Sequence, residues 1–304
     1  MLDVVVTCLP HSGEIRSFPQ VRGFYLAKHL AKLGLDVEFR PLPQPGLTCR
    51  VLICSEYQSP VEYFHRELEP RFQEIDADRM FCMIANSLRH DRGHFSREHC
   101  EWFAARGGVL VHLPADEFES YEHWIGLGVD RDVVTRATAT ERNRVLFDFP
   151  RAADQDASNT FDVRVLTAVR SGVPGAQVVG SGPADSPLRA FFDDWIEYGQ
   201  AHATYTRAAL DGAFAFVPGW GETMGLAVAE AQIVGAAVVF SQYRVPDVMV
   251  CPEADVRYTA DDVDSLVDAL VTARGRNPDL IAAQAAARFD FYAVSRRTRR
   301  AIGL

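Results

Sequence analysis

Short apolar runs alternate with amphipathic stretches along the first half of the chain. Apolar residues recur at helical spacing in Pro19–Leu33, which ends at Gly34, so we predict a helix there. Strands are predicted at Leu2–Leu9, Val37–Phe39, Val51–Cys54, Met80–Ile84 and Val109–His112. Further helices are predicted at Pro60–Ile75 and Phe95–Ala105. Such alternation is typical of a parallel sheet with helices on both faces.

The same alternation starts again near Val145. The predicted strands are Val145–Phe149, Gln177–Gly180, Ala213–Val217 and Ala236–Phe240. The predicted helices are Phe161–Ser171, Ala201–Leu210, Leu226–Val234, Val263–Ala273 and the helical stretch Pro278–Leu304. A second α/β domain is therefore expected.

The stretch Asp130–Arg144 is polar, charged and weakly periodic, which indicates a domain boundary. We expect an α/β protein of two doubly wound, Rossmann-like domains that face a central cleft. The expected N-terminal domain is 1–140 and the C-terminal domain is 141–285. Residues 286–304 are expected to form a helix. One possibility is that this helix packs back on the N-terminal domain. Ligands of such folds bind outside the carboxyl ends of the strands.

Composition narrows the possible partners. Lys plus Arg number 31 and Asp plus Glu 41, so the formal net charge is −10, which argues against a nucleic-acid partner. No apolar run is long enough to span a bilayer, and we expect at most peripheral membrane contact. One basic cluster is read either as a solvated helix face or as a contact for a phosphorylated or membrane-bound acceptor: Arg296, Arg297, Arg299 and Arg300.

The six cysteines form no Cys-x-x-Cys pair. Cys8, Cys54 and Cys82 lie in predicted strands, where a free cysteine behaves as a small hydrophobic residue. This usage favours a reducing, cytoplasmic setting.

The segment 213–231 carries the most informative chemistry. A predicted strand is followed by a Pro/Gly-rich turn, and a helix is expected to open at about Met224–Gly225 and to run through Glu230. A helix start offers unpaired N–H groups and the positive end of its dipole to a diphosphate. Glycines that let a ligand approach the backbone closely are Gly219, Gly221 and Gly225.

Two carboxylates, Glu222 and Glu230, lie about two helical turns apart in this segment. In one interpretation Glu222 faces the sugar of a bound donor and Glu230 accepts hydrogen bonds from a ribose diol. In the other, Glu222 caps the helix and Glu230 is a surface helix residue. Spacing alone leaves both open.

The stretch Pro218-Gly-Trp-Gly-Glu-Thr-Met-Gly-Leu-Ala-Val-Ala-Glu-Ala231, followed by Gly235-Ala-Ala-Val-Val239, resembles the Glu-x7-Glu signature of retaining GT-B glycosyltransferases of family four. Weaker matches follow the family's order at Gly128-Val-Asp130, Gln177-Val-Val-Gly-Ser-Gly-Pro183 and Ile196-Glu-Tyr-Gly199. The resemblance covers residues 128–273 well and the N-terminal half only by architecture.

The resemblance implies roles for individual residues. Glu222 would contact the transferred sugar near its C3 hydroxyl, and Glu230 would bind the nucleotide ribose. Gly13 would let the diphosphate or acceptor approach, and His112 would lie near the reacting sugar carbon, unless it is a core histidine. The remaining donor-site residues are Gly180, Gly182, Tyr198, Gly221, Thr223, Met224, Gly225 and Leu226, with backbone N–H groups offered by the last three.

One departure from the family concerns the diphosphate. The family pairs an Arg with a Lys a few residues later; Arg151 fits the Arg, but Ala-Ala-Asp-Gln-Asp follows it and no Lys. The leaving-group charge would then depend on Arg151 and the helix start, or on another cation such as Arg164 or Arg170. Catalytic activity is put in question by this difference.

The resemblance implies front-face substitution, in which the diphosphate oxygen takes the acceptor proton and no metal or cofactor is required. The donor would be a UDP-, GDP- or TDP-sugar, and the acceptor is not predicted. Two alternatives stay open: a catalytically weakened nucleotide-sugar-binding or partner-subunit protein, and another α/β enzyme such as a sugar-nucleotide epimerase or NAD-binding protein. Gly180-Ser-Gly182 would fit the start of the Gly-x-Gly-x-x-Gly motif of an NAD-binding protein, but Asp185 occupies the position of the third glycine.

Overall fold

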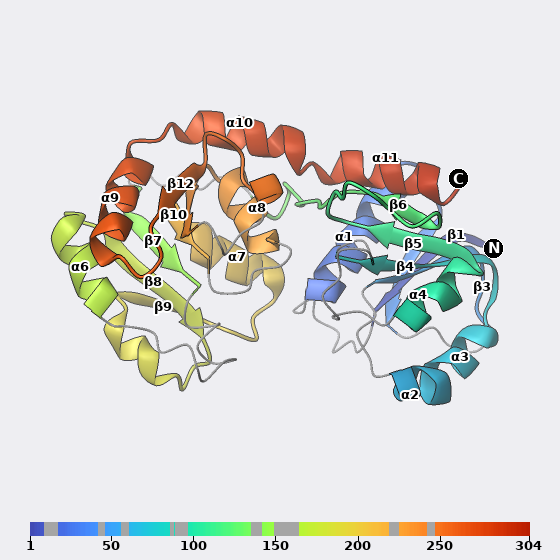
Figure 1. Cartoon of the computed structure of the whole chain (residues 1–304). Helices are drawn as coiled ribbons and strands as arrows, with labels where there is room; N and C mark the ends of the chain where they lie inside the picture. The colour runs from blue at the N-terminus through green and yellow to red at the C-terminus, as the bar shows by residue number, and fades with distance from the viewer. Residues whose placement is uncertain are drawn as a thin grey trace. The chain divides into compact units, whose positions relative to one another are not determined.

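The computed structural model describes residues 1–8, 18–41, 46–55, 61–85, 88, 97–134, 142–148, 164–218, 225–241 and 247–304. Contacts divide the chain into two compact units (Figure 1). Unit 1 comprises Met1–Gly128 together with Phe291–Leu304, and unit 2 comprises Val129–Asp290. The chain therefore passes from unit 1 into unit 2 and then returns to unit 1. The boundaries of the units, after Gly128 and after Asp290, differ from those of the expected domains 1–140 and 141–285.

Unit 1 is built on a parallel sheet with the strand order β2-β1-β3-β4-β5-β6. The strands are β1 (Leu2–Cys8), β2 (Val37–Pro41), β3 (Thr48–Ser55), β4 (Asp76–Ile84), β5 (Gly107–Val111) and β6 (Glu122–Trp124). The last five residues of β1, β3 and β4 are all buried, as expected for strands covered on both faces.

Helices cover both faces of this sheet. They are α1 (Phe18–Lys32), α2 (Val61–Tyr63), a π-helical segment (Phe64–Leu68), α3 (Glu69–Gln73), α4 (Arg97–Ala104) and α11 (Phe291–Ala301). In Figure 1, α11 lies above the sheet of unit 1, and α2, α3 and α4 lie below it. The single helix predicted over Pro60–Ile75 is thus interrupted by a π-helical segment.

Helix α11 packs on α1 within unit 1. The rings of His29 and Phe291 stack with their centroids 5.2 Å apart. Arg299 donates a hydrogen bond to the carbonyl of Leu33, at 3.2 Å, and Arg297 donates one to Ile125, at 2.6 Å. Two members of the basic cluster are therefore held by backbone carbonyls.

Unit 2 is built on a second parallel sheet, with the order β12-β11-β10-β7-β8-β9. The strands are β7 (Arg144–Phe147), β8 (Gln177–Gly182), β9 (Asp194–Glu197), β10 (Ala213–Val217), β11 (Ala237–Ser241) and β12 (Asp255–Tyr258). Counted from the first strand of this unit, the order is 3-2-1-4-5-6, that of a Rossmann fold. Its topological switch point lies between β7 and β10.

The α-helices of unit 2 are α6 (Arg164–Gly172), α7 (His202–Leu210), α8 (Leu226–Ile233), α9 (Val263–Arg274) and α10 (Pro278–Arg288). The helical stretch predicted over Pro278–Leu304 is two helices, because the chain leaves unit 2 between Asp290 and Phe291. Gly235 ends α8 with a φ of +87°, and a Cβ there would lie 2.6 Å from the carbonyl oxygen of Pro278. Glycine is therefore required at this turn.

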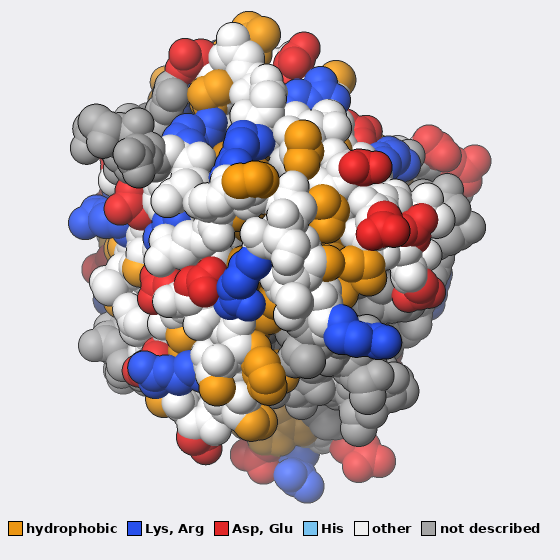
Figure 2. Space-filling model, turned by 90° about the vertical axis from the view of Figure 1, so that its left-hand side faces the viewer, with side chains coloured by type: hydrophobic (Ala, Val, Ile, Leu, Met, Phe, Trp, Pro, Cys, Tyr) orange, Lys and Arg blue, Asp and Glu red, His pale blue; other side chains and the backbone are white. Residues whose placement is uncertain are grey.

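The face of unit 2 that carries α6 and α9 is turned toward the viewer in Figure 2. Acidic, basic and hydrophobic side chains are interspersed on it. In the described part of the chain, no helix is long and apolar enough to cross a membrane.

All six cysteines are free and buried. Burial raises the pKa of the Cys8 thiol to about 11. The predicted role of Cys8, Cys54 and Cys82 as small buried hydrophobic residues is confirmed.

Candidate functional site

The candidate site in unit 2 is organised by the start of α8. Gly225 precedes this helix in the left-handed region, with a φ of +63°. A Cβ at this position would lie 3.3 Å from both Met249 and Val228, so a larger residue would be both strained and crowded. The helix begins at Leu226, within two residues of the predicted start.

Glu230 lies on α8 and is buried rather than a surface helix residue. Its carboxylate oxygen Oε1 lies 2.7 Å from Nε2 of His202, the first residue of α7. The side chains of His202 and Glu230 are 11% and 8% exposed. The polar partner that a buried carboxylate requires is therefore supplied by a histidine.

Charges around His202 favour its protonated form. Burial alone would lower the pKa of His202, but the negative charge of Glu230, the hydrogen bond to it and the more distant charge of Asp130 together raise the pKa above its ordinary value. Asp130 is itself buried, and its side chain accepts a hydrogen bond from the backbone N–H of Asp132 at 2.9 Å.

Strands β7 and β10 lie side by side at the switch point, with Phe147 paired with Val217. In an open parallel sheet, ligands bind outside the strand ends at such a point. In the sequence Arg151 follows β7, and Glu222 follows β10. Arg151 and Glu222, two of the three predicted catalytic residues, thus come a few positions after the ends of neighbouring strands, although their own positions lie outside the described residues.

Several other predicted site residues also lie outside the described residues. They are Gly13, Gly221, Thr223 and Met224, together with Gly219 and Trp220 of the same sequence segment.

Gly180 and Gly182 lie within β8 and not in a loop before a helix. A Cβ at Gly180 would lie 2.8 Å from the rings of Phe192 and Trp195, and one at Gly182 would lie 2.6 Å from Trp195. Close packing of aromatic rings therefore accounts for glycine at both positions. Tyr198 follows β9 and donates its backbone N–H to the carbonyl of Gly182 at 2.9 Å. A donor-binding role for these residues stays a prediction.

His112 lies directly after β5 in unit 1 and is 3% exposed. Its Nδ1 donates to the carbonyl of Gly126 at 2.9 Å, and its Nε2 has no hydrogen-bond partner among the described residues. Burial lowers the pKa of His112 well below its ordinary value, and the charge of the buried Arg22 lowers it further. The ring is therefore neutral at physiological pH, with the lone pair on Nε2.

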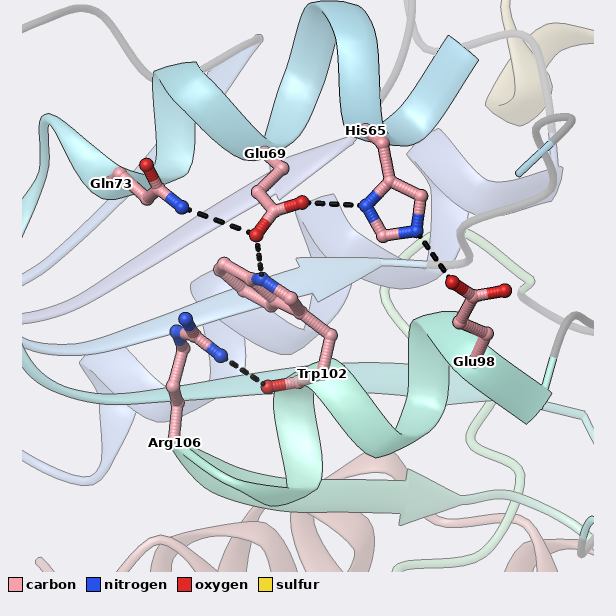
Figure 3. Close-up of polar contacts among 6 residues, drawn as sticks. All are labelled: His65, Glu69, Gln73, Glu98, Trp102 and Arg106. Atoms are coloured by element: carbon pink, nitrogen blue, oxygen red, sulfur yellow. Dashed lines mark hydrogen bonds and ion pairs between the residues drawn. The ribbon is translucent and has the colours of Figure 1, made fainter. Parts of the chain in front are cut away.

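A second histidine–carboxylate cluster lies on the surface of unit 1 (Figure 3). Nδ1 of His65 is 2.5 Å from Glu69, and its Nε2 is 2.8 Å from Glu98. Trp102 donates its indole N–H to the other oxygen of Glu69 at 2.7 Å. Glu69 and then Glu98 raise the pKa of His65, and the bond from His65 lowers the pKa of Glu69. No group of three potential ligands is arranged to hold a metal ion within the described ranges.

No protein-family model and no curated protein matches this chain. Solved structures do. Sucrose-phosphate synthase of Thermosynechococcus elongatus is 13% identical with a TM-score of 0.64, and the match covers 98% of each chain. A glycosyltransferase of Rickettsia africae is 8% identical with a TM-score of 0.62, over 99% of each chain. The protein HepE of Anabaena, solved in complex with UDP and glucose, is 10% identical with a TM-score of 0.59, over 99% of each chain.

The chain has the GT-B fold. The predicted fold of two Rossmann-like α/β domains is confirmed by the two parallel sheets and by matches that span nearly the whole chain. The dinucleotide-binding alternative is not favoured, because Gly180 and Gly182 belong to the strand β8.

His202 and Arg22 were not among the predicted site residues. The bond between His202 and Glu230 joins residues 28 positions apart, and no local pattern in the sequence marks it. Arg22 lies on the apolar face of α1. A charged residue is rare at such a position, so the sequence pattern could have marked Arg22 as a candidate.

Proposed function

We propose that this protein is a glycosyltransferase that takes a sugar from a nucleotide-diphosphate sugar. The observation that carries the proposal is the switch point of unit 2, where β7 and β10 lie side by side and are followed in the sequence by Arg151 and by the Pro/Gly-rich segment that contains Glu222. The start of α8 adds backbone N–H groups and a positive dipole end suited to a diphosphate.

The buried carboxylate of Glu230 supports a nucleotide donor. Ribose hydroxyls donate hydrogen bonds, and a carboxylate on a rigid helix is a suitable acceptor for a diol. One oxygen of Glu230 contacts His202, and the other would accept a hydrogen bond from a ribose hydroxyl. We therefore favour a ribose-binding role for Glu230 over a purely structural one.

The finer proposal is retaining, metal-independent transfer, with the roles that the family resemblance implies. Glu222 would bind the sugar near its C3 hydroxyl, and Arg151 would stabilise the leaving diphosphate. A diphosphate oxygen would take the acceptor proton on the same face of the sugar, so the protein contributes positioning and electrostatics. His112, neutral and with an available lone pair on Nε2, would accept a hydrogen bond near the reacting carbon.

A second candidate is a donor-binding protein with weakened catalysis. It is motivated by the sequence after Arg151, which lacks the Lys that usually helps to neutralise the diphosphate. This candidate predicts nucleotide-sugar binding without turnover.

A thermal-shift screen with UDP-, GDP- and TDP-sugars tests donor binding. A donor at 100 times its dissociation constant should stabilise the protein by about 2.7 kcal/mol. Donor hydrolysis and transfer are then followed in the wild type, in Glu222→Gln and in Arg151→Ala, with circular dichroism to verify folding. Unchanged turnover in either variant contradicts its assigned role, and an inverted anomeric product contradicts retention. If no sugar nucleotide stabilises the wild type, the proposed function is wrong.

A further inference from the structure

The contact between His202 and Glu230 suggests more than a structural pair. His202 opens α7 directly after the strand β9 and its turn, and Glu230 lies one turn from the C-terminal end of α8. Both side chains are almost completely buried, and Nε2 and Oε1 are 2.7 Å apart. This contact restrains the orientation of the Glu230 carboxylate.

We propose that protonated His202 is a positioning residue for the donor nucleotide: it orients Glu230 for the ribose hydroxyls and compensates the carboxylate charge next to a dianionic sugar nucleotide. The inference rests on the proposed function and concerns its regulation by pH. His202 is not assigned a contact with the reacting atoms.

Charge balance supports this role. The diphosphate of a sugar nucleotide carries negative charge, and a buried carboxylate in the same site would repel it at low local dielectric. A protonated imidazole cancels the charge of Glu230 at hydrogen-bond distance. Among the described residues, two charged groups act on His202: Glu230 of α8 and Asp130, which follows Val129 in the chain. Both are acidic, so the histidine is the positive member of this group.

The direction of the pH dependence follows. Because Glu230 and Asp130 raise the pKa of His202, the imidazole is protonated at slightly acidic pH and loses its proton as the pH rises. Loss of that proton leaves the carboxylate uncompensated, and donor affinity should fall. Donor binding and protonation of His202 are linked equilibria. If deprotonation of His202 weakens donor binding by a given factor, bound donor changes the acid dissociation constant of His202 by the same factor. A tenfold loss thus corresponds to a rise of about one unit in the pKa of His202 on binding.

The test is calorimetric titration of the wild type with UDP-glucose, GDP-glucose and TDP-glucose between about pH 5.5 and 8.5, where histidine titrates. Sugar nucleotides are suitable probes because their phosphate diesters do not titrate in this range. We expect affinity to fall about tenfold from the acid to the alkaline end. For the same donor, KM should rise with pH while kcat at saturating donor stays nearly constant.

Two variants isolate His202. His202→Gln keeps a hydrogen-bond donor to Glu230 but cannot be protonated, so its donor affinity should be low and independent of pH. Asp130→Asn keeps an acceptor for the Asp132 N–H and should move the midpoint of the pH profile to lower pH. The matched control is His65→Gln, which removes a histidine that also contacts carboxylates but belongs to unit 1. Its profile should equal that of the wild type.

The outcomes are distinct. If His202→Gln, shown to be folded by circular dichroism, retains the wild-type pH dependence, the role of His202 is wrong while the proposed function stands. The same conclusion follows if the imidazole resonances of His202 show no change in pKa on addition of a donor that binds. If none of the three sugar nucleotides binds the wild type at any pH, the proposed function itself fails.

Discussion

Two histidine–carboxylate groups in this protein share their chemistry and differ in their surroundings. In unit 2, His202 and Glu230 form a single pair with side chains 11% and 8% exposed. In unit 1, His65 lies between Glu69 and Glu98, with His65 39% and Glu98 60% exposed. Both arrangements raise the pKa of the histidine. Only the buried pair is shielded from solvent screening, so only there should removal of one partner have a large effect.

The strongest test of this comparison removes each histidine. His202→Leu leaves the Glu230 carboxylate buried without its partner, and we expect the free energy of unfolding to fall by about 3 kcal/mol. His65→Leu, the matched variant, should leave stability unchanged within error, because water replaces the imidazole at that exposed site. Urea unfolding followed by circular dichroism measures both, and amide exchange assigns the loss to unit 2. Equal losses in the two variants contradict the comparison.

A second prediction concerns the glycine that begins the helix of Glu230. Gly225→Ala places a side chain in the left-handed region and in contact with Met249 and Val228, and should destabilise the protein by about 1–2 kcal/mol. Gly34→Ala, the control in unit 1, has a φ of +85° but open space around its Cβ. Gly34→Ala should show the conformational strain without the steric crowding. A larger loss of stability in Gly34→Ala than in Gly225→Ala would therefore contradict the crowding predicted at Gly225.

The smallest expected effect concerns salt. Both histidines have a raised pKa in the folded state. At the buried His202 the raised pKa contributes stability that is lost as pH rises through the raised value, whereas at the exposed His65 this contribution is too small to measure. At about 1 M salt the Debye length is ~3 Å, so the shift at His65 should largely disappear while that at His202 persists. Imidazole resonances titrated at low and high salt measure both shifts. Collapse of the His202 shift would show that the pair is solvated.

Strand prediction succeeded where burial dictates the residue types. The predicted strand Ala213–Val217 coincides with β10, because its five residues are all buried and apolar. The strands β6 and β12 were not predicted, since both lie at a sheet edge, are short and contain charged residues such as Glu122 and Arg257. Their position depends on the neighbouring strand rather than on their own hydrophobic pattern.

Helix prediction failed where tertiary contacts divide a periodic stretch. Pro278–Leu304 is helical by pattern, but its two halves belong to different units, and the division falls at Phe289 and Asp290. There the carbonyl of Phe289 accepts a hydrogen bond from Val129. That partner lies far away in the sequence, so no local window could have indicated the interruption.

The candidate site was predictable in part. Glu230 and Gly225 were selected from the strand–turn–helix pattern and the family resemblance, and the structure places both at α8. His202 was not selected, because its significance depends on a contact between two helices that the sequence does not encode locally. The sequence motif thus predicts one member of the buried pair, whereas the other is evident only from the contact in the folded structure.

The return of the chain to unit 1 has a consequence for biosynthesis. Residues 291–304 leave the ribosome only after all of unit 2, yet α11 supplies the Phe291 ring that stacks on His29 and the Arg299 bond to Leu33. Unit 2 is continuous in sequence and can complete its contacts first, although it is translated second. A fragment ending at Gly128 would leave one side of α1 uncovered, so separate expression should favour 129–290.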